Sequence, residues 1–217
     1  MDSARIEKLL KDLQDGRISL EQALDGLRAL PYADLGYAQV DLHRELRQGL
    51  PEVVFCQNKT IPQAIGIFHK LWEHHDRIMG TRLTPELAEA LQTEFPEGSY
   101  NPTSRLFTLT RSPTSASDER TPYVAVVSAG TADLPVAEEA AQTLDFLGDR
   151  VERIYDVGVA GIHRLLDKRQ RLVSASVVIS VAGMEGALTS VVAGLVPCPV
   201  IGVPTSVGYG AHFDGLA

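Results

Sequence analysis

The chain has 217 residues, a formal net charge of −8 and a pI near 5.2, with 44% hydrophobic and 22% charged residues. An acidic globular chain of this kind is not expected to bind nucleic acid or an anionic membrane surface. Its two cysteines, Cys56 and Cys198, are too few for a disulfide framework, and the charged N-terminus lacks the apolar core of a signal peptide. We therefore expect a cytoplasmic protein.

Two short amphipathic helices are predicted at the N-terminus. In residues 3–14 the apolar side chains recur at helical spacing and share one face. Ser19 and Gln22 form a capping-box pattern that opens the second helix, and Pro31 ends it. We expect these helices to pair as a hairpin that is too small to be stable alone.

A charged arm follows at residues 34–59, and it includes a predicted strand at Val53–Phe55. Arg44 and Arg47 are three residues apart, so they share one helical face and could both bind a phosphate or carboxylate. The alternative is a solvated face held by salt bridges, which is what most runs of charge are.

The remainder of the N-terminal region is predicted to be mostly helical. Thr60 caps a helix that runs to about Gly80, and its histidines suit exposed helix surface better than a metal site. Thr84 is predicted to start another helix. Residues 96–104 are expected to form a loop, and Leu106–Thr110 is predicted to be a strand. The predicted organisation is an N-terminal region at 1–110, a linker at 111–121 and a second domain at 122–217.

The C-terminal half alternates strands with helices. Apolar, β-branched runs predict strands near residues 124–127, 151–155, 177–181 and 199–203. The segments between them predict helices near residues 135–147, 162–168 and 185–195. This rhythm predicts a three-layer α/β domain with a parallel sheet. Glycines and prolines interrupt the nearly uncharged stretch at 172–203, so we interpret it as strand, helix and strand rather than a membrane span. A helix start at the very end predicts a domain truncated at its C-terminus.

Each predicted strand ends in a turn of small or reactive residues. Ligands of parallel α/β sheets bind beyond the carboxyl ends of the strands, so these turns predict a ligand crevice. The candidates are Ser128, Gly130, Thr131 and Asp133 in the first turn, Asp156 and Gly158 in the second, Glu185 in the third, and Thr205, Ser206, Gly208, Tyr209 and His212 in the fourth.

Simpler roles exist for some of these candidates. Asp133 could only cap its helix, and Glu185 could only favour a helix N-terminus. A carboxylate at Glu185, inside an apolar stretch, would have to be paired or hydrogen-bonded. Ser206 and His212 do not read as a hydrolase pair, because no G-x-S-x-G elbow is present.

The first loop, Ser128 to Pro135, resembles the aminoimidazole ribonucleotide (AIR) carboxylase superfamily, in which a serine and an aspartate hold a ribose phosphate. The stretch Gly183–Leu188 lacks that superfamily's third-loop histidine, which weakens a role in the purine pathway. The chain is more similar to the LarB family of nickel-pincer cofactor biosynthesis proteins. The similarity includes the arm at 41–55, the turn at 156–161, the loop at 183–186 and the motif at 203–210.

The LarB resemblance implies a pyridinium-3,5-biscarboxylic acid mononucleotide synthase. Such an enzyme carboxylates the pyridinium ring of nicotinic acid adenine dinucleotide, or of NAD as an analogue, with CO2 or bicarbonate. It also hydrolyses the phosphoanhydride to release AMP. A thiolate added to the ring makes it enamine-like and able to attack CO2. That family's cysteine would lie beyond Ala217, so this chain is expected to be inactive if it ends there.

The resemblance also implies roles for the candidate residues. Asp156, Glu185 and His212 are catalytic candidates, and the first two are alternatively magnesium ligands. The remaining candidates bind substrate: Arg44, Arg47, Ser128, Gly130, Thr131, Asp133, Gly158, Thr205, Ser206, Gly208 and Tyr209. The superfamily implies a flavodoxin-like sheet and a homo-oligomer, commonly an octamer. The alternatives are an AIR carboxylase or mutase, and a non-catalytic nucleotide-binding module.

Overall fold

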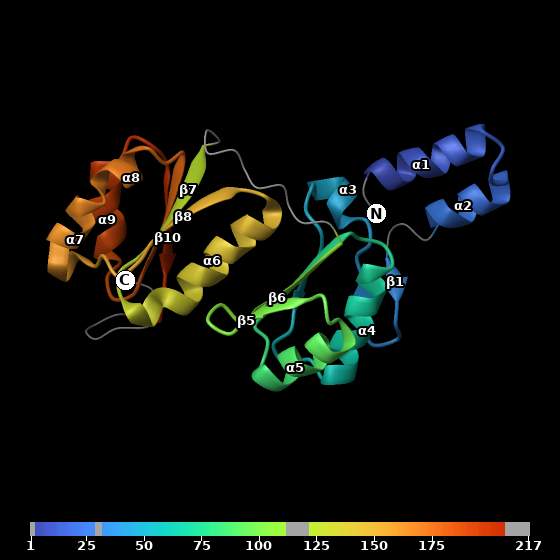
Figure 1. Cartoon of the computed structure of the whole chain (residues 1–217), viewed down its shortest axis with the longest axis horizontal. Coiled ribbons are helices and arrows are strands. Elements are labelled where there is room, and N and C mark those ends of the chain that lie inside the picture. Colours follow the sequence, from blue (N-terminus) through green and yellow to red (C-terminus); the bar gives the residue numbers. More distant parts are fainter. Residues whose placement is uncertain (1–2, 29–31, 112–121, 207–217) are drawn as a thin grey trace. The chain divides into compact units, whose positions relative to one another are not determined.

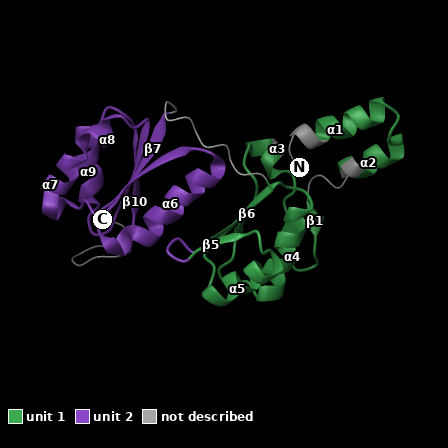
Figure 2. Cartoon of the chain, viewed as in Figure 1, with its two compact units in different colours: residues 1–101, 106–113 green, residues 102–105, 114–217 purple. Residues whose placement is uncertain are grey.

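The computed structural model describes residues 3–28, 32–111 and 122–206. The chain consists of two compact units (Figure 2). Unit 1 comprises residues 1–101 and 106–113, and unit 2 comprises residues 102–105 and 114–217. Most of the expected linker at 111–121 lies outside the described residues.

The described part of unit 1 contains helices and two small sheets (Figure 1). The helices are α1 (Ser3–Gln14), α2 (Leu20–Arg28), α3 (Arg44–Gln48), α4 (Ile61–Trp72) and α5 (Pro85–Glu94). The strands are β1 (Ala33–Asp34), β2 (Gln39–Val40), β3 (Val53–Phe55), β4 (Arg77–Thr81), β5 (Ser99–Asn101) and β6 (Leu106–Thr110). β1 and β2 pair with each other, and the others form a mixed sheet in the order β3-β4-β6-β5.

Capping residues start the helices of unit 1 where the sequence predicts. Ser19 and Gln22 form the expected capping box before α2, with backbone-to-side-chain distances of 2.8 and 3.1 Å. Thr60 and Gln63 form a second one before α4. One apolar core joins the mixed sheet to α4 and α5, with Phe68, Phe107 and Leu109 completely buried. These predictions are confirmed because capping is a local property of the chain.

Two strands of unit 1 differ from the prediction. The helix expected to reach Gly80 ends at Trp72, and the rest of that segment forms β4. β4 is central in its sheet, parallel to β3 and antiparallel to β6, and its Ile78 and Met79 are buried. The expected loop at 96–104 contains β5, which pairs with β6. In both cases pairing with distant residues decides the local structure.

Unit 2 has the predicted α/β architecture. Its strands are β7 (Tyr123–Ser128), β8 (Arg150–Ile154), β9 (Val177–Ala182) and β10 (Val200–Pro204). Its helices are α6 (Leu134–Leu147), α7 (Ile162–Asp167), α8 (Arg169–Val173) and α9 (Ala187–Leu195), with short 3-10 turns at Thr131–Asp133 and Val159–Gly161. All strand pairs in this sheet are parallel. The described strands therefore match the predicted βαβαβαβ rhythm.

Helices cover both faces of the sheet in unit 2 (Figure 1). On one face, α6 packs against Val126 and Val181. On the other face, α7, α8 and α9 bury Leu165, Leu172 and Val192. None of the helices in the described part of the chain combines the length and apolar character needed to cross a bilayer.

Candidate functional site

The strand order of unit 2 points to one place for a ligand. The order is β10-β9-β7-β8, so the chain passes first to one side of β7 and then to the other. The loops that follow β7 and β9 leave the sheet in opposite directions, and a crevice opens between them at the carboxyl ends of the strands. A cavity of about 620 Å³ lies there, lined from the loops after β7, β8 and β9. Its volume is in the range of small-molecule sites.

Asp133 ties the first loop to the fourth. Its Oδ1 accepts a hydrogen bond from the Thr205 hydroxyl at 2.6 Å, and its Oδ2 accepts one from the Gly130 backbone N–H at 2.9 Å. Asp133 and Thr205 are buried, at 5% and 4% exposure. Asp133 is the N-cap residue of α6 but makes no side-chain cap bond there, and its bond to Gly130 caps the short 3-10 turn at Thr131–Asp133 instead. The carboxylate holds the cavity wall together, and Thr131 beside it is exposed.

Ser128 connects the first loop to the second. Its side chain is completely buried, and its Oγ accepts the Asp156 backbone N–H at 3.2 Å. Ser128 therefore supports the loop, and its expected contact with a ligand stays a prediction. The next residues of the second loop continue the same pairing, because Val157 and Gly158 donate backbone hydrogen bonds to Ser128 and Ala129.

Asp156 supplies the one carboxylate of the second loop, residues 156–161, and its side chain is exposed. Its φ of +57° lies in the left-handed region, which is uncommon for a residue other than glycine. Its Oδ2 accepts a hydrogen bond from Arg164 Nη1 at 2.7 Å, and both side chains line the cavity. Gly158 is needed for space, since a Cβ there would lie 2.8 Å from the Ala129 carbonyl oxygen.

The third loop places Glu185 differently from the prediction. We expected a carboxylate held inside an apolar stretch, but Glu185 is exposed at the cavity rim. Left-handed conformations at Met184 and Gly186, with φ of +57° and +67°, turn the loop outward before α9 begins. The carboxylate therefore reaches solvent without needing a buried partner.

The fourth loop is described only at its start. Thr205 is buried and its N–H donates to the Ala182 carbonyl, whereas Ser206 is exposed. Three predicted site residues, Gly208, Tyr209 and His212, lie outside the described residues.

Arg44 and Arg47 belong to unit 1. They share α3 as predicted, but protein groups already bind them: Arg47 Nη2 is 2.8 Å from Asp41 Oδ2, and Arg44 Nε donates to Gln48 Oε1. Burial alone would raise the pKa of Asp41, but the bonds from Arg47 and from the His43 backbone outweigh it and lower that pKa. This part of the arm matches the salt-bridged alternative.

A buried pair also holds α3 in unit 1. His75 Nδ1 lies 2.9 Å from Glu45 Oε2, and the His75 side chain is completely buried. The hydrogen bond from His75 is the main cause that lowers the pKa of Glu45. This contact was not predicted, because the three histidines near α4 were expected on exposed helix surface.

Among the described residues no group of three or more His, Cys, Asp or Glu side chains comes together. Magnesium commonly takes only one or two carboxylates together with water and phosphate, so the alternative role of Asp156 and Glu185 as magnesium ligands stays a prediction. In this structure Asp156 is paired with Arg164.

Arg164 lines the cavity although the sequence did not predict it as a site residue. Among the described residues that line the cavity it is the one cation, and it is paired with Asp156, while Asp133 and Glu185 are the other carboxylates of the lining. Its signal in the sequence was its position three residues after Gly161, where the short turn after a strand passes into the next helix.

These features define a flavodoxin-like α/β domain with a small-molecule cavity at its switch point. Comparison with known families agrees: residues 123–217 match the AIR carboxylase family, and residues 32–111 match the LarB/PurE-like N-terminal domain. The uncharacterized protein MJ0165 of Methanocaldococcus jannaschii is 36% identical over 219 residues, which cover 97% of this chain and 85% of that protein. The chain therefore belongs to the LarB-like family, with an AIR carboxylase domain at its C-terminal side, and its function is of the carboxylase type.

Proposed function

We propose that this protein carboxylates the pyridinium ring of nicotinic acid adenine dinucleotide and hydrolyses its phosphoanhydride. The products are pyridinium-3,5-biscarboxylic acid mononucleotide and AMP. The observation that carries the proposal is the cavity at the switch point, lined by one arginine and three carboxylates, in a chain that combines LarB-like and AIR carboxylase domains. CO2 or bicarbonate is the co-substrate.

The lining residues suit an anionic nucleotide. Arg164 can leave Asp156 and donate to a phosphate or carboxylate, which a guanidinium binds in a bidentate way. Asp156, once released, is a base close to the bound ring. Glu185 at the rim is the second acid/base candidate. Gly130 allows the backbone to approach the ligand, since it has no side chain at the cavity wall, where a Cβ would lie 3.7 Å from Asp133 Oδ2.

The proposed reactions need no oxidant or reductant. A thiolate adds to the ring, the resulting enamine-like carbon forms a bond to CO2, and a carboxylate then removes the ring proton. Expulsion of the thiolate restores the aromatic ring. In the second reaction, water attacks a phosphorus of the anhydride and AMP leaves.

Neither described cysteine is suited to be that thiolate. Cys56 belongs to unit 1, and burial raises the pKa of its thiol to about 12. Cys198 precedes β10, whereas Thr205 and the cavity follow it. A strand of this length separates the two ends by roughly 17 Å.

The test is mass spectrometry after incubating the full-length protein with nicotinic acid adenine dinucleotide and 13C-bicarbonate, with and without magnesium. We expect AMP and a pyridinium mononucleotide that is heavier by one labelled carboxyl group. The Arg164→Ala variant should raise KM, by roughly 10- to 100-fold for a lost charge-assisted contact. The Asp156→Asn variant should lower kcat instead.

Two other results would replace the proposal. Binding of the dinucleotide without any labelled product would identify a non-catalytic nucleotide-binding module. Carboxylation of aminoimidazole ribonucleotide instead would identify an AIR carboxylase or mutase, which the family match of residues 123–217 makes the second candidate.

We also propose that the protein works as a homo-oligomer, as the AIR carboxylase resemblance implies. Sedimentation equilibrium of the full-length protein tests this, and a monomer at micromolar concentration would contradict it.

A further inference from the structure

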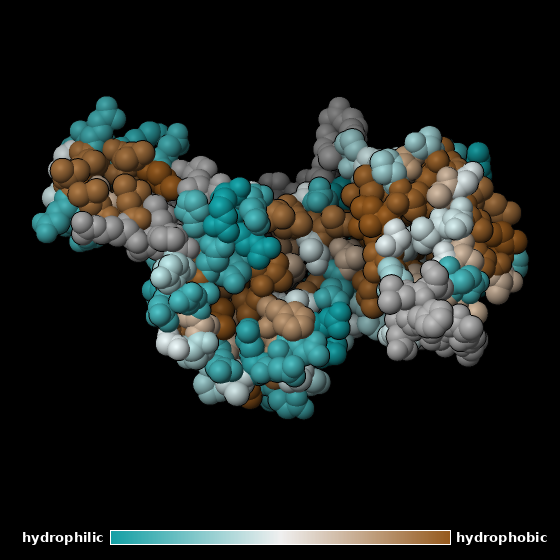
Figure 3. Space-filling model, turned by 180° about the vertical axis from the view of Figure 1, so that it is seen from behind, coloured by the Kyte–Doolittle hydropathy of each residue, from teal (hydrophilic) through white to brown (hydrophobic). Residues whose placement is uncertain are grey.

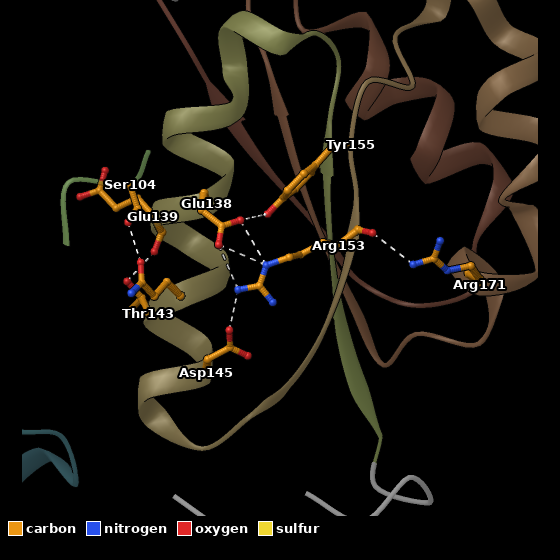
Figure 4. Close-up of polar contacts among 9 residues, drawn as sticks. Ser104, Glu138, Glu139, Thr143, Asp145, Arg153, Tyr155 and Arg171 are labelled. Atoms are coloured by element: carbon orange, nitrogen blue, oxygen red, sulfur yellow. Dashed lines mark hydrogen bonds and ion pairs between the residues drawn. The ribbon is translucent and has the colours of Figure 1, made fainter. Parts of the chain in front are cut away.

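A polar cluster outside the cavity joins α6 to β8 (Figure 4). Glu138 on α6 accepts hydrogen bonds from Arg153 Nε at 3.1 Å and from the Tyr155 hydroxyl at 2.7 Å. Arg153 also donates a hydrogen bond to Asp145, in the last turn of α6, at 2.6 Å. The Glu138 side chain is 17% exposed, so its hydrogen bonds are partly shielded from water.

The members of this cluster have different positions relative to the cavity. Arg153 lies within β8 and bonds to two turns of α6, so it fastens the helix to the sheet. Tyr155 lies just after β8 and immediately before Asp156. Its hydroxyl therefore fixes the point at which the second loop leaves the sheet. The helix that carries Glu138, α6, begins directly after Asp133 of the cavity wall.

Asp156 needs such support. A left-handed conformation in a non-glycine residue costs free energy and persists only where neighbouring contacts impose it. Asp156 itself is exposed, and its described supports are one bond from its N–H to Ser128 and the pair with Arg164. The substrate is proposed to take Arg164 away, which leaves the backbone of the loop as the remaining constraint.

We propose that Tyr155 is a positioning residue, which holds Asp156 in its left-handed, cavity-facing conformation through the hydrogen bond from its hydroxyl to Glu138. The kinetic part of this inference rests on the proposed function, and the structural part does not. Burial, followed by the bond to Glu138 and its charge, raises the pKa of the phenol, so Tyr155 stays a donor throughout the neutral range.

Removal of one hydroxyl tests the proposal. Tyr155→Phe deletes the donor but keeps the ring, which packs against the core between α6 and the sheet. Tyr123→Phe is the matched control. Tyr123 is the first residue of β7, at the opposite end of the sheet from the cavity, and its hydroxyl donates to the Arg171 carbonyl. Both variants are made in the full-length protein.

The first readout is hydrogen–deuterium exchange at the backbone amides of Asp156, Val157 and Gly158, which bond to the first loop. A hydrogen bond to a charged group is worth about 1.5–3 kcal/mol, so exchange should become faster by roughly tenfold or more in Tyr155→Phe. Amides within β8 and α6 should change by less than about twofold, because Arg153 still joins them. Tyr123→Phe should leave the loop amides unchanged.

The second readout separates kcat from KM. If Tyr155 positions Asp156 for proton transfer, kcat should fall about tenfold while KM stays within about twofold. Equal acceleration of exchange in α6, β8 and the loop would show a merely structural role and overturn the proposal, as would unchanged exchange in the loop. If the wild-type protein makes no product, the exchange result alone decides the positioning role, and the failure belongs to the proposed function.

Discussion

At the scale of single residues, Cys56 shows how burial decides chemistry. The side chain is 2% exposed in the core of unit 1, and its thiol donates to the Val54 carbonyl. Burial is the largest cause that raises the pKa of this thiol to about 12, from an ordinary value of 9.0. A thiol that remains protonated is a poor nucleophile.

We therefore expect Cys56 to be inert toward an aromatic disulfide reagent at pH 8 until the protein unfolds. Of these two cysteines the half-buried Cys198 should react faster, and Cys198→Ser should remove its labelling phase. Because the folded pKa is raised, the contribution of Cys56 to stability is complete below pH 9 and is lost as the pH rises toward 12. Fast labelling of Cys56 in the folded protein would contradict this.

A second residue-scale prediction concerns Gly158, whose φ of −58° any residue can adopt. Its role is to leave room, because a Cβ would lie 2.8 Å from a backbone carbonyl oxygen. Gly158→Ala should therefore destabilise unit 2 by about 1–3 kcal/mol in urea denaturation. Gly194→Ala is the control, since its Cβ would meet nothing within 4 Å and alanine favours helix. Equal stability of the two variants would rule out the steric role.

At the scale of elements, α4 depends on its capping box. Thr60 accepts a hydrogen bond from the Gln63 N–H, and Gln63 accepts one in return. Thr60→Ala should cost about 1 kcal/mol of unfolding free energy in unit 1. Thr93→Ala in α5 removes only a bond to the Glu89 carbonyl within a helix, so it should be close to neutral. A neutral Thr60→Ala would mean that tertiary packing alone sets the start of α4.

At the scale of the whole molecule, each unit has apolar cores of its own, built from different residues. On the surface, hydrophilic and hydrophobic residues occur in both units (Figure 3). The chain has one tryptophan, Trp72, which packs against the core of unit 1. Its fluorescence therefore reports on unit 1, whereas far-UV circular dichroism reports on both units.

This separation predicts how two matched core variants behave. Leu172→Ala in α8 and Leu91→Ala in α5 each remove a completely buried side chain, at a cost of about 2–5 kcal/mol. Leu91→Ala should lower the midpoint of the fluorescence transition in urea, and Leu172→Ala should lower the circular dichroism midpoint without changing the fluorescence. If both probes move together for both variants, the two units unfold as one.

The amino-acid sequence by itself determined the features that depend on neighbours along the chain. Apolar runs and turn residues predicted the strands of unit 2, and capping patterns predicted the starts of α2, α4 and α5. The parallel sheet followed, and with it the edge at which a ligand should bind, because a strand–helix–strand connection has few alternatives.

Only the tertiary structure decided the contacts between distant residues. Thr205 and Asp133 are 72 positions apart, and β4 became a strand because β3 and β6 pair with it on either side. The pair of Asp156 with Arg164 and the outward turn of Glu185 depend on loop conformations with positive φ. Local propensities do not encode such contacts, since the free energy that holds them comes from groups that meet only when the chain is folded.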